Sequence, residues 1–204
     1  MGHRGRRRLG DRFGSAKQYA PLAGRRVIDW SIDGARSVAD GVVLVVPGEA
    51  AEEPEPAVDA VAVGGDTRSD SVRAGLALVP ADVEVVLVHD GARPLADHAL
   101  FRSVVDAVLA GADAAVPVVE VLDTICDTHG APVDRAGLRS VQTPQGFAVD
   151  ALRRVHAVHP EATDDASLVA AAGGRLRLVQ GDRWNLKVTE PQDLAVVESI
   201  LAAR

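Results

Sequence analysis

Short aliphatic runs alternate with amphipathic stretches along most of this chain, and the alternation limits the folds that it can adopt. The aliphatic runs predict strands, and they cover residues 42–46, 59–63, 83–88, 112–116 and 175–180. The amphipathic stretches predict helices, and they cover residues 27–38, 69–79, 97–110, 148–158, 165–172 and a segment that starts at Pro191. Strands that alternate with helices predict an α/β fold with a Rossmann-like, doubly wound and mostly parallel sheet.

The length and the composition agree with a single domain over residues 1–204. Apolar residues make up 47% of the chain but aromatic residues only 3%, so the core must be built from valine, alanine, leucine and isoleucine. Buried parallel strands have this aliphatic character. Residues 118–142 interrupt the alternation with strand-like pieces and turns but no helical pattern. We therefore expect these residues to form an arm that leaves the domain.

Residue counts and charge disfavour several classes of protein. Cys126 is the only cysteine, so no disulfide can form within a monomer, and a reducing, cytoplasmic location is favoured. No apolar run reaches the roughly 18 residues of a membrane helix. Residues 1–26 hold eight basic residues and one acid, although the whole chain has a net charge of −7. This asymmetry indicates a local anion site or a solvated basic tail and no nucleic-acid surface.

Polar, glycine-containing turns follow two of the predicted strands. Gly64-Gly65-Asp66 ends one strand, and His89-Asp90-Gly91-Ala92-Arg93 ends the next. Ligands of doubly wound sheets bind at these carboxyl ends. The first turn predicts either backbone groups that recognise the edge of a base or an ordinary helix cap. The second places a carboxylate that could hold Mg²⁺ or a ribose hydroxyl, or form a structural pair with the nearby arginine.

Two further segments carry candidate anion-binding groups. Four glycines lie among the arginines that precede Lys17, and such a loop could cradle a triphosphate or remain a basic terminus. Lys187 lies in a short apolar stretch, where a lysine either extends to solvent or points at an anion. Thr163 precedes a predicted helix as a possible cap.

Eight motifs occur in an order that resembles the 2-C-methyl-D-erythritol 4-phosphate cytidylyltransferases, from about residue 4 to the C-terminus. They are Ala16-Lys17-Gln18-Tyr19, Gly64-Gly65-Asp66-x-Arg68-x-x-Ser71-Val72, Val88-His89-Asp90-Gly91-Ala92-Arg93-Pro94, Asp123-Thr124-Ile125, Val133-Asp134-Arg135, Gln142-Thr143-Pro144-Gln145, Thr163-Asp164-Asp165-Ala166-Ser167 and Asn185-Leu186-Lys187-Val188-Thr189. The resemblance implies that CTP and methylerythritol phosphate, a sugar-alcohol phosphate, give CDP-methylerythritol and pyrophosphate with Mg²⁺ as cofactor. Fixed cations would stabilise the charge that develops on the phosphates.

The resemblance also implies roles for individual residues. Arg8, Lys17 and Lys187 match the catalytic cations, with Arg8 favoured over Arg7 as the loop arginine. Substrate-binding positions are matched by Gly65, Asp66 and Ser71 at the cytosine, by Asp90 and Gly91 at the ribose and metal, and by Arg93, Thr143 and Thr163 at other positions on the substrate side. In the family the arm embraces a second subunit, so Thr124 and Arg135 would contact the sugar phosphate bound by the partner of a homodimer.

The chain departs from the family pattern in two regions. The family begins with an aliphatic strand that is missing here, and a misassigned start, a fragment or a decayed copy would each explain this. Cys126 and Pro132 stand in the arm where many members carry lysine and threonine. The altered arm keeps open another acceptor, such as ribitol 5-phosphate, and the missing strand keeps open a non-catalytic paralogue that binds nucleotide.

Overall fold

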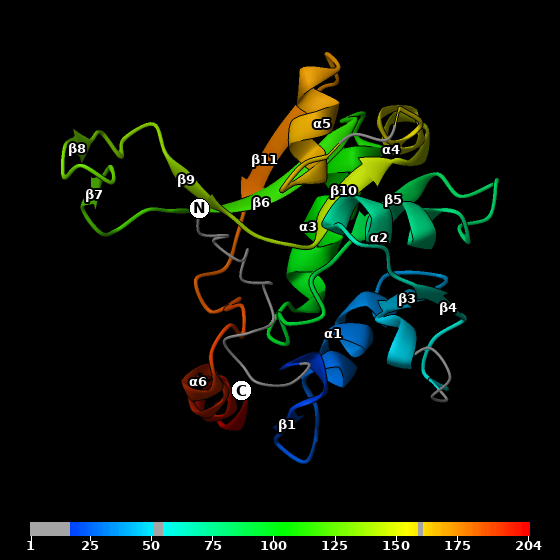
Figure 1. Cartoon of the computed structure of the whole chain (residues 1–204), viewed down its shortest axis with the longest axis horizontal. Helices are drawn as coiled ribbons and strands as arrows, with labels where there is room; N and C mark the ends of the chain where they lie inside the picture. Colours follow the sequence, from blue (N-terminus) through cyan, green and yellow to red (C-terminus); the bar gives the residue numbers. More distant parts are fainter. Residues whose placement is uncertain (1–16, 51–54, 159–160) are drawn as a thin grey trace, which may run out of the picture.

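The predicted alternation of strands and helices is confirmed in the computed structural model, which describes residues 17–50, 55–158 and 161–204 (Figure 1). The predicted strands form β3 (Val43–Val46), β4 (Ala60–Val63), β5 (Val85–Val88), β6 (Ala114–Glu120) and β11 (Leu176–Gln180). The predicted helices form α1 (Val27–Arg36), α2 (Arg68–Leu76), α3 (His98–Leu109), α4 (Val149–His156), α5 (Asp165–Ala171) and α6 (Pro191–Ala202). Arg8 and the glycine-rich loop around it lie outside the described residues.

The main sheet contains a strand that the sequence did not predict. Its strand order is β11-β6-β10-β5, and the additional strand β10 (Gln145–Ala148) runs antiparallel to both β5 and β6. A β-carbon at Gly146 would lie 2.5 Å from a methyl group of Val104, so glycine lets α3 pack against β10. The antiparallel pairing of β10 makes the sheet mixed, whereas a mostly parallel sheet was expected.

A second difference concerns β3 and β4, which form a parallel pair of their own. Among the described residues, no strand joins this pair to the main sheet, whereas the sequence predicted one continuous sheet. The inner face of β3 still contributes to the core, because Leu44 and Val46 pack with Ile28 and Ile32 of α1. Helix α2 contacts both strands. The pair is therefore attached through helices α1 and α2.

Both faces of the main sheet are covered, as the doubly wound prediction requires. Ala114 and Val116 of β6 pack with α4 and α5 in one cluster of buried residues. Ala115 lies between them in the sequence and packs with α3 in another cluster. Successive side chains of a strand point to opposite faces, so β6 has helices on both sides. This coverage explains why the strand is almost entirely aliphatic.

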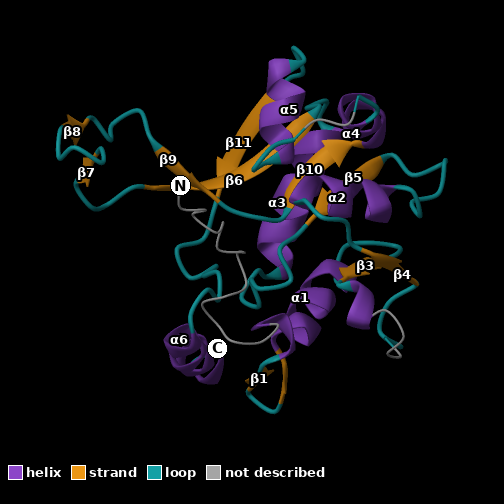
Figure 2. Cartoon of the chain, in the orientation of Figure 1, coloured by secondary structure: helices purple, strands orange, loops and turns teal. Residues whose placement is uncertain are grey.

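Residues 118–142 leave the body as the predicted arm, which Figures 1 and 2 show projecting from the end of β6. It contains β7 (Ile125–Cys126), β8 (Pro132–Val133) and β9 (Arg139–Val141), with no helix. Only β9 joins the main sheet, by pairing with β6. Leu122 and Val141 are 57% and 46% exposed, so apolar surface of the arm faces outward.

Two small features complete the framework of the site. A hairpin of β1 (Pro21–Leu22) and β2 (Arg25–Arg26), which was not predicted, follows a turn of 3₁₀-helix, η1 (Lys17–Tyr19). A second such turn, η2 (Gly48–Ala50), follows β3. In the described part of the chain, no helix is long and apolar enough to cross a membrane.

Candidate active site

Asp90 lies at the centre of a group of charged residues beyond the end of β5. Its Oδ2 is 2.8 Å from Nζ of Lys187 and 3.6 Å from Nε of Arg93. Burial alone would raise the pKa of Asp90, but the charges of Lys187 and Arg93 outweigh it and lower this pKa below its usual value. The carboxylate is therefore ionised at neutral pH. Three predicted site residues thus meet, and the predicted structural pair of Asp90 with Arg93 is also present.

Thr143 and His89 fix the backbone of this segment by a chain of hydrogen bonds. The amide of Asp90 donates to Oγ1 of Thr143 over 3.0 Å, and the same hydroxyl lies 3.1 Å from Nδ1 of His89. Burial lowers the pKa of His89 to about 4, so the ring is neutral at neutral pH. Its Nε2, 3.3 Å from the carbonyl oxygen of Arg93, then donates there, and Nδ1 accepts from Thr143. His89 therefore orients Asp90 through Thr143.

Asn185 connects the same segment to Lys187, a function that the sequence analysis missed. Its side chain is buried and donates to the carbonyl oxygen of Thr143 over 2.8 Å. The backbone carbonyl oxygen of Asn185 accepts from Nη1 of Arg93 over 2.7 Å. Three residues later, the amide of Val188 donates to the carbonyl oxygen of Ala92 over 2.8 Å. The available signals were its place at the start of the motif Asn185-Leu186-Lys187-Val188-Thr189 and its position beside an apolar stretch.

Lys17, the first residue of η1, reaches the same site. Burial lowers its pKa, and the neighbouring charge of Lys187 lowers it further, whereas Asp90 and Asp193 act in the opposite direction. The chain contains 20 arginines and only two lysines, and both lysines are in this group. The three cations Lys17, Lys187 and Arg93 outnumber the carboxylates Asp90 and Asp193, so this group of residues has an excess of positive charge, which favours an anion.

The turn that was predicted to read a base edge lies between β4 and α2. Gly65 and Asp66 are exposed, and a β-carbon at Gly65 would lie only 2.2 Å from that of Asp70, so the turn requires glycine. The alternative prediction, a helix cap, is confirmed, because the amide of Asp70 donates to Oγ1 of Thr67 over 3.0 Å. Ser71 donates to the carbonyl oxygen of Thr67 and closes the first turn of α2.

Gly91 packs against α1 at the floor of the site. Its carbonyl oxygen accepts from the hydroxyl of Ser31 over 3.2 Å. A β-carbon at Gly91 would lie 3.3 Å from Cδ1 of Ile28, so an alanine would need only a small shift of that side chain. The site could therefore accept an alanine at position 91 with little change in its structure.

The structure does not bring every predicted residue to this group. Thr124 and Arg135 lie exposed on the arm, and in the described ranges no hydrogen bond or ion pair joins them to the residues around Asp90. Thr163 is exposed two residues before α5. Arg8 lies outside the described residues. Thr124 and Arg135 therefore lie apart from the residues around Asp90 within one chain.

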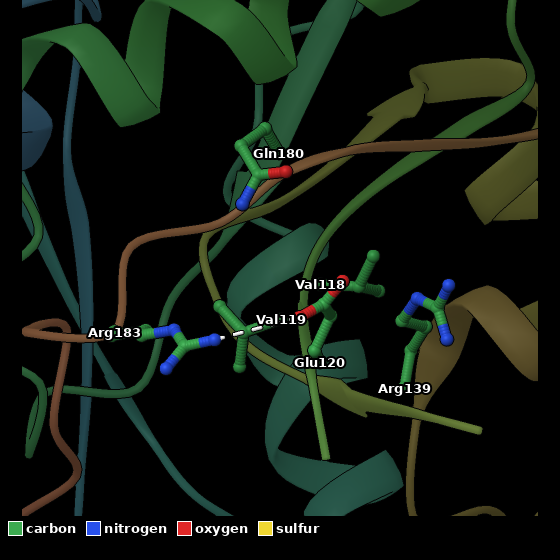
Figure 3. A pocket seen from close by; sticks show the side chains of 6 residues that line it. All are labelled: Val118, Val119, Glu120, Arg139, Gln180 and Arg183. Atoms are coloured by element: carbon green, nitrogen blue, oxygen red, sulfur yellow. Dashed lines mark ion pairs between the residues drawn. The ribbon is translucent and has the colours of Figure 1, made fainter. Parts of the chain in front are cut away.

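A pocket of about 350 Å³ lies at the base of the arm and is separate from the predicted site (Figure 3). Its lining residues are Val118, Val119, Glu120, Arg139, Gln180 and Arg183. Glu120 and Arg183 form an ion pair over 3.5 Å, so part of its charge is already neutralised. None of the predicted site residues lines it.

Known proteins are similar to this chain over almost its whole length. The sequence pattern of the 2-C-methyl-D-erythritol 4-phosphate cytidylyltransferases matches residues 4–203. The chain belongs to this family. The cytidylyltransferase of Nocardia farcinica is 42% identical, and the match covers 97% of this chain and 90% of that protein. The one from Rubrobacter xylanophilus is 41% identical, with 96% and 91% covered.

The fold agrees with solved members of the cytidylyltransferase family. The crystal structure of 2-C-methyl-D-erythritol 4-phosphate cytidylyltransferase from Thermus thermophilus superimposes with a TM-score of 0.83 at 36% identity. That match covers 91% of this chain and 94% of the other. The mixed α/β sheet described above is therefore the fold of the cytidylyltransferases.

Proposed function

We propose that the chain transfers a cytidylyl group from CTP to 2-C-methyl-D-erythritol 4-phosphate in the non-mevalonate isoprenoid pathway. An oxygen of the acceptor phosphate attacks the α-phosphorus of CTP, and the bond to the β-phosphate breaks, so pyrophosphate leaves with the electron pair. The observation that carries this proposal is the ion pair of Lys187 with Asp90, close enough to Lys17 for both charges to act on it, in a chain that belongs to the cytidylyltransferase family. Fixed cations at that point stabilise the charge that accumulates on the phosphates.

The remaining residues bind and orient the substrates in this proposal. The exposed backbone of Gly65 and Asp66, with Ser71 behind it, contacts the cytosine, and Gly91 beside Asp90 contacts the ribose. Arg93, Thr143 and Thr163 serve the acceptor side. Thr143 already donates to His89 and accepts from Asp90, so it acts mainly by holding Asp90 in place.

The residues present fit a Mg²⁺ ion that is shared with the substrates. In the described ranges, no three histidine, cysteine, aspartate or glutamate residues are grouped to hold a metal. Mg²⁺ is commonly bound by one or two carboxylates together with substrate phosphates and water. Asp90 is ionised and would supply the protein's carboxylate. The bound ion would neutralise charge on the phosphates of CTP.

Pyrophosphate release tests the proposed activity directly. The chain is incubated with CTP, Mg²⁺ and either methylerythritol phosphate or ribitol 5-phosphate, and we expect release with the first acceptor. The second acceptor is included because Cys126 and Pro132, the two departures in the arm, pair directly across β7 and β8. Release with ribitol 5-phosphate alone would transfer the assignment to that acceptor. No release with either acceptor, from this chain or from the extended version described next, would indicate a non-catalytic paralogue.

A version extended upstream by an aliphatic strand belongs in the same assay. In the described residues, β3 pairs with β4 alone and β5 with β10 alone, although both strands are aliphatic and no residue of β5 is fully buried. Such edges are normally paired or covered, so we propose that a further strand adds to one of them. Activity that appears only in the extended version would support this proposal, and equal activity of both versions would refute it.

We also propose a cytoplasmic location, which cell fractionation tests, because the only cysteine is exposed and unpaired.

We propose that the active enzyme is a homodimer in which the arm completes the partner's site. The exposed apolar residues of the arm and the distance of Arg135 from any contact with the Asp90 group support this. Arg135→Ala and Lys17→Ala subunits are each expected to be nearly inactive. After mixing and reassociation, a mixed dimer regains one complete site, so random pairing should restore about one quarter of the sites.

The mixing experiment has a decisive alternative outcome. If Arg135 acted within its own subunit, each site of the mixed dimer would lack one group, and activity would not return. Sedimentation at the assay concentration supplies the second measurement. A monomer that retains full activity would rule out the shared site.

A further inference from the structure

A buried ion cluster joins three helices beside the proposed cytidine site, and none of the roles above uses it. The side chain of Asp165 has no exposed surface, and its Oδ2 lies 2.6 Å from Nη2 of Arg68. Its Oδ1 accepts from Nε2 of His156 over 2.9 Å. Arg68 begins α2, Asp165 begins α5 and His156 ends α4. The cluster therefore sets how the starts of α2 and α5 are spaced.

Neither stability nor helix preference accounts for this arrangement. Replacing a buried ion pair by apolar residues of similar volume is often neutral or stabilising, so such pairs are weak contributors to stability. A positive charge in the first turn of a helix is also opposed by the helix dipole, and Arg68 occupies that position in α2. Nη1 of Arg68 is buried without a hydrogen-bond partner among the described residues, which adds to the desolvation penalty.

The cluster connects two segments that the proposed function assigns to the substrates. Asp66 lies two residues before Arg68, and Thr163 lies two residues before Asp165. A second contact joins the same segments, because the amide of Ala162 donates to the buried hydroxyl of Ser69 over 3.2 Å. The ion pair thus joins the Gly65–Asp66 turn to the segment that contains Thr163.

A further contact extends this network to the Asp90 group. Asp164, next to Asp165, accepts from Nε2 of Gln145 over 3.1 Å. Gln145 is buried and begins β10, two residues after Thr143. The Asp90 group is nevertheless held by its own contacts with Thr143, Asn185 and Val188. A change in the cluster should therefore shift the position of the Gly65–Asp66 turn more than the positions of Lys17 and Lys187.

We infer that Arg68 and Asp165 are positioning residues that hold the Gly65–Asp66 turn and the Thr163 segment at the spacing that CTP requires. The inference rests on the proposed function and specifies which buried residues control nucleotide affinity. Neither residue touches the substrate in this scheme. Loss of the pair loosens the turn, so the KM for CTP rises while the chemical step, carried by Lys17 and Lys187, changes little.

The test measures kcat and the KM for CTP by pyrophosphate release in Asp165→Asn, Arg68→Gln and the double variant. We expect Asp165→Asn to raise the KM about tenfold and to change kcat by less than about threefold. The double variant should add less than about twofold to the larger single effect, because both changes remove one interaction. Arg68→Lys keeps the positive charge but replaces the planar guanidinium by a single ammonium group. Its expected KM for CTP lies between those of the wild type and Arg68→Gln.

Val169→Ala is the matched control for a general loss of stability. Val169 is 1% exposed, lies on the same helix as Asp165 and packs in the core, so this variant lowers the unfolding temperature without touching the ion pair. Its KM for CTP should stay within about twofold of the wild type. An equal rise of the KM in Val169→Ala would show that the cluster acts only through stability and would overturn the inference.

The remaining outcomes separate the inference from the proposed function. An unchanged KM in Arg68→Lys and Arg68→Gln, with a fully active wild type, overturns the positioning role and leaves the function intact. These two variants keep the test valid if Asp165→Asn does not fold, because Arg68 is one-third exposed. Absence of pyrophosphate release from the wild type overturns the function, and the positioning role with it.

Discussion

Lys17→Ala should lower kcat by about 10² to 10³-fold, the range found when one preorganised electrostatic group is removed from an active site. The physical reason is that Lys17 lies within range of the charges of Lys187 and Asp90, where it would neutralise charge on the leaving pyrophosphate. The unfolding temperature should stay the same or rise slightly, because Lys187 and burial both already lower the pKa of Lys17 and so oppose its charge in the free protein. Steady-state kinetics and thermal unfolding measure the two effects.

The pH dependence of kcat/KM gives an independent check on Lys17. The cation is present below its pKa and lost as the pH rises through it, and that pKa is lowered in the folded chain. Activity should therefore fall at alkaline pH, and Lys17→Arg should keep part of its activity there because arginine stays charged. Arg36→Ala, which removes an exposed cation paired with Asp59, is the control and should leave kcat unchanged. Equal turnover of Lys17→Ala and wild type would remove the proposed mechanism.

Asp90→Asn should lower kcat/KM by about 10²-fold or more and should also raise the Mg²⁺ concentration needed for half-maximal activity. The amide keeps the shape of the side chain but removes the charge that pairs with Lys187 and Arg93. The free energy of unfolding at neutral pH should fall by about 1 kcal/mol. The loss is small because Lys187 is partly exposed and solvent screens the ion pair. Kinetics at several Mg²⁺ concentrations and denaturant unfolding test these expectations.

The stability contribution of Asp90 has a definite pH dependence. Its pKa is lowered in the folded protein, so the contribution is present above the pKa of the unfolded chain and is lost as the pH falls through the folded one. The stability gap between wild type and Asp90→Asn should therefore shrink in acid. Asp113→Asn is the matched control, because Asp113 has a similar exposure and pairs with Arg175 away from the site. If Asp90→Asn left the Mg²⁺ dependence unchanged, Asp90 would not be a ligand of the ion.

Local patterns in the sequence were sufficient for most of the helices and strands. The periodicity of α1 and the aliphatic run of β6 depend on neighbouring residues, and hydrophobic spacing reports such short-range structure well. Ordered motifs placed Asp90 at a strand end and Lys187 in an apolar stretch. The absence of a helix in residues 118–142 was also predicted, because the arm contains no helical periodicity.

Tertiary structure alone decided which of these segments meet. The position of β10 between β5 and β6 depends on the close approach of Val104 to Gly146, and no local pattern encodes a contact between residues so far apart. The same holds for the hydrogen bonds from Asp90 through Thr143 to His89, and for the ion pair between Arg68 and Asp165, which are almost 100 residues apart. Residue types and local spacing determined what chemistry this chain can carry, whereas long-range packing determined where those groups come together.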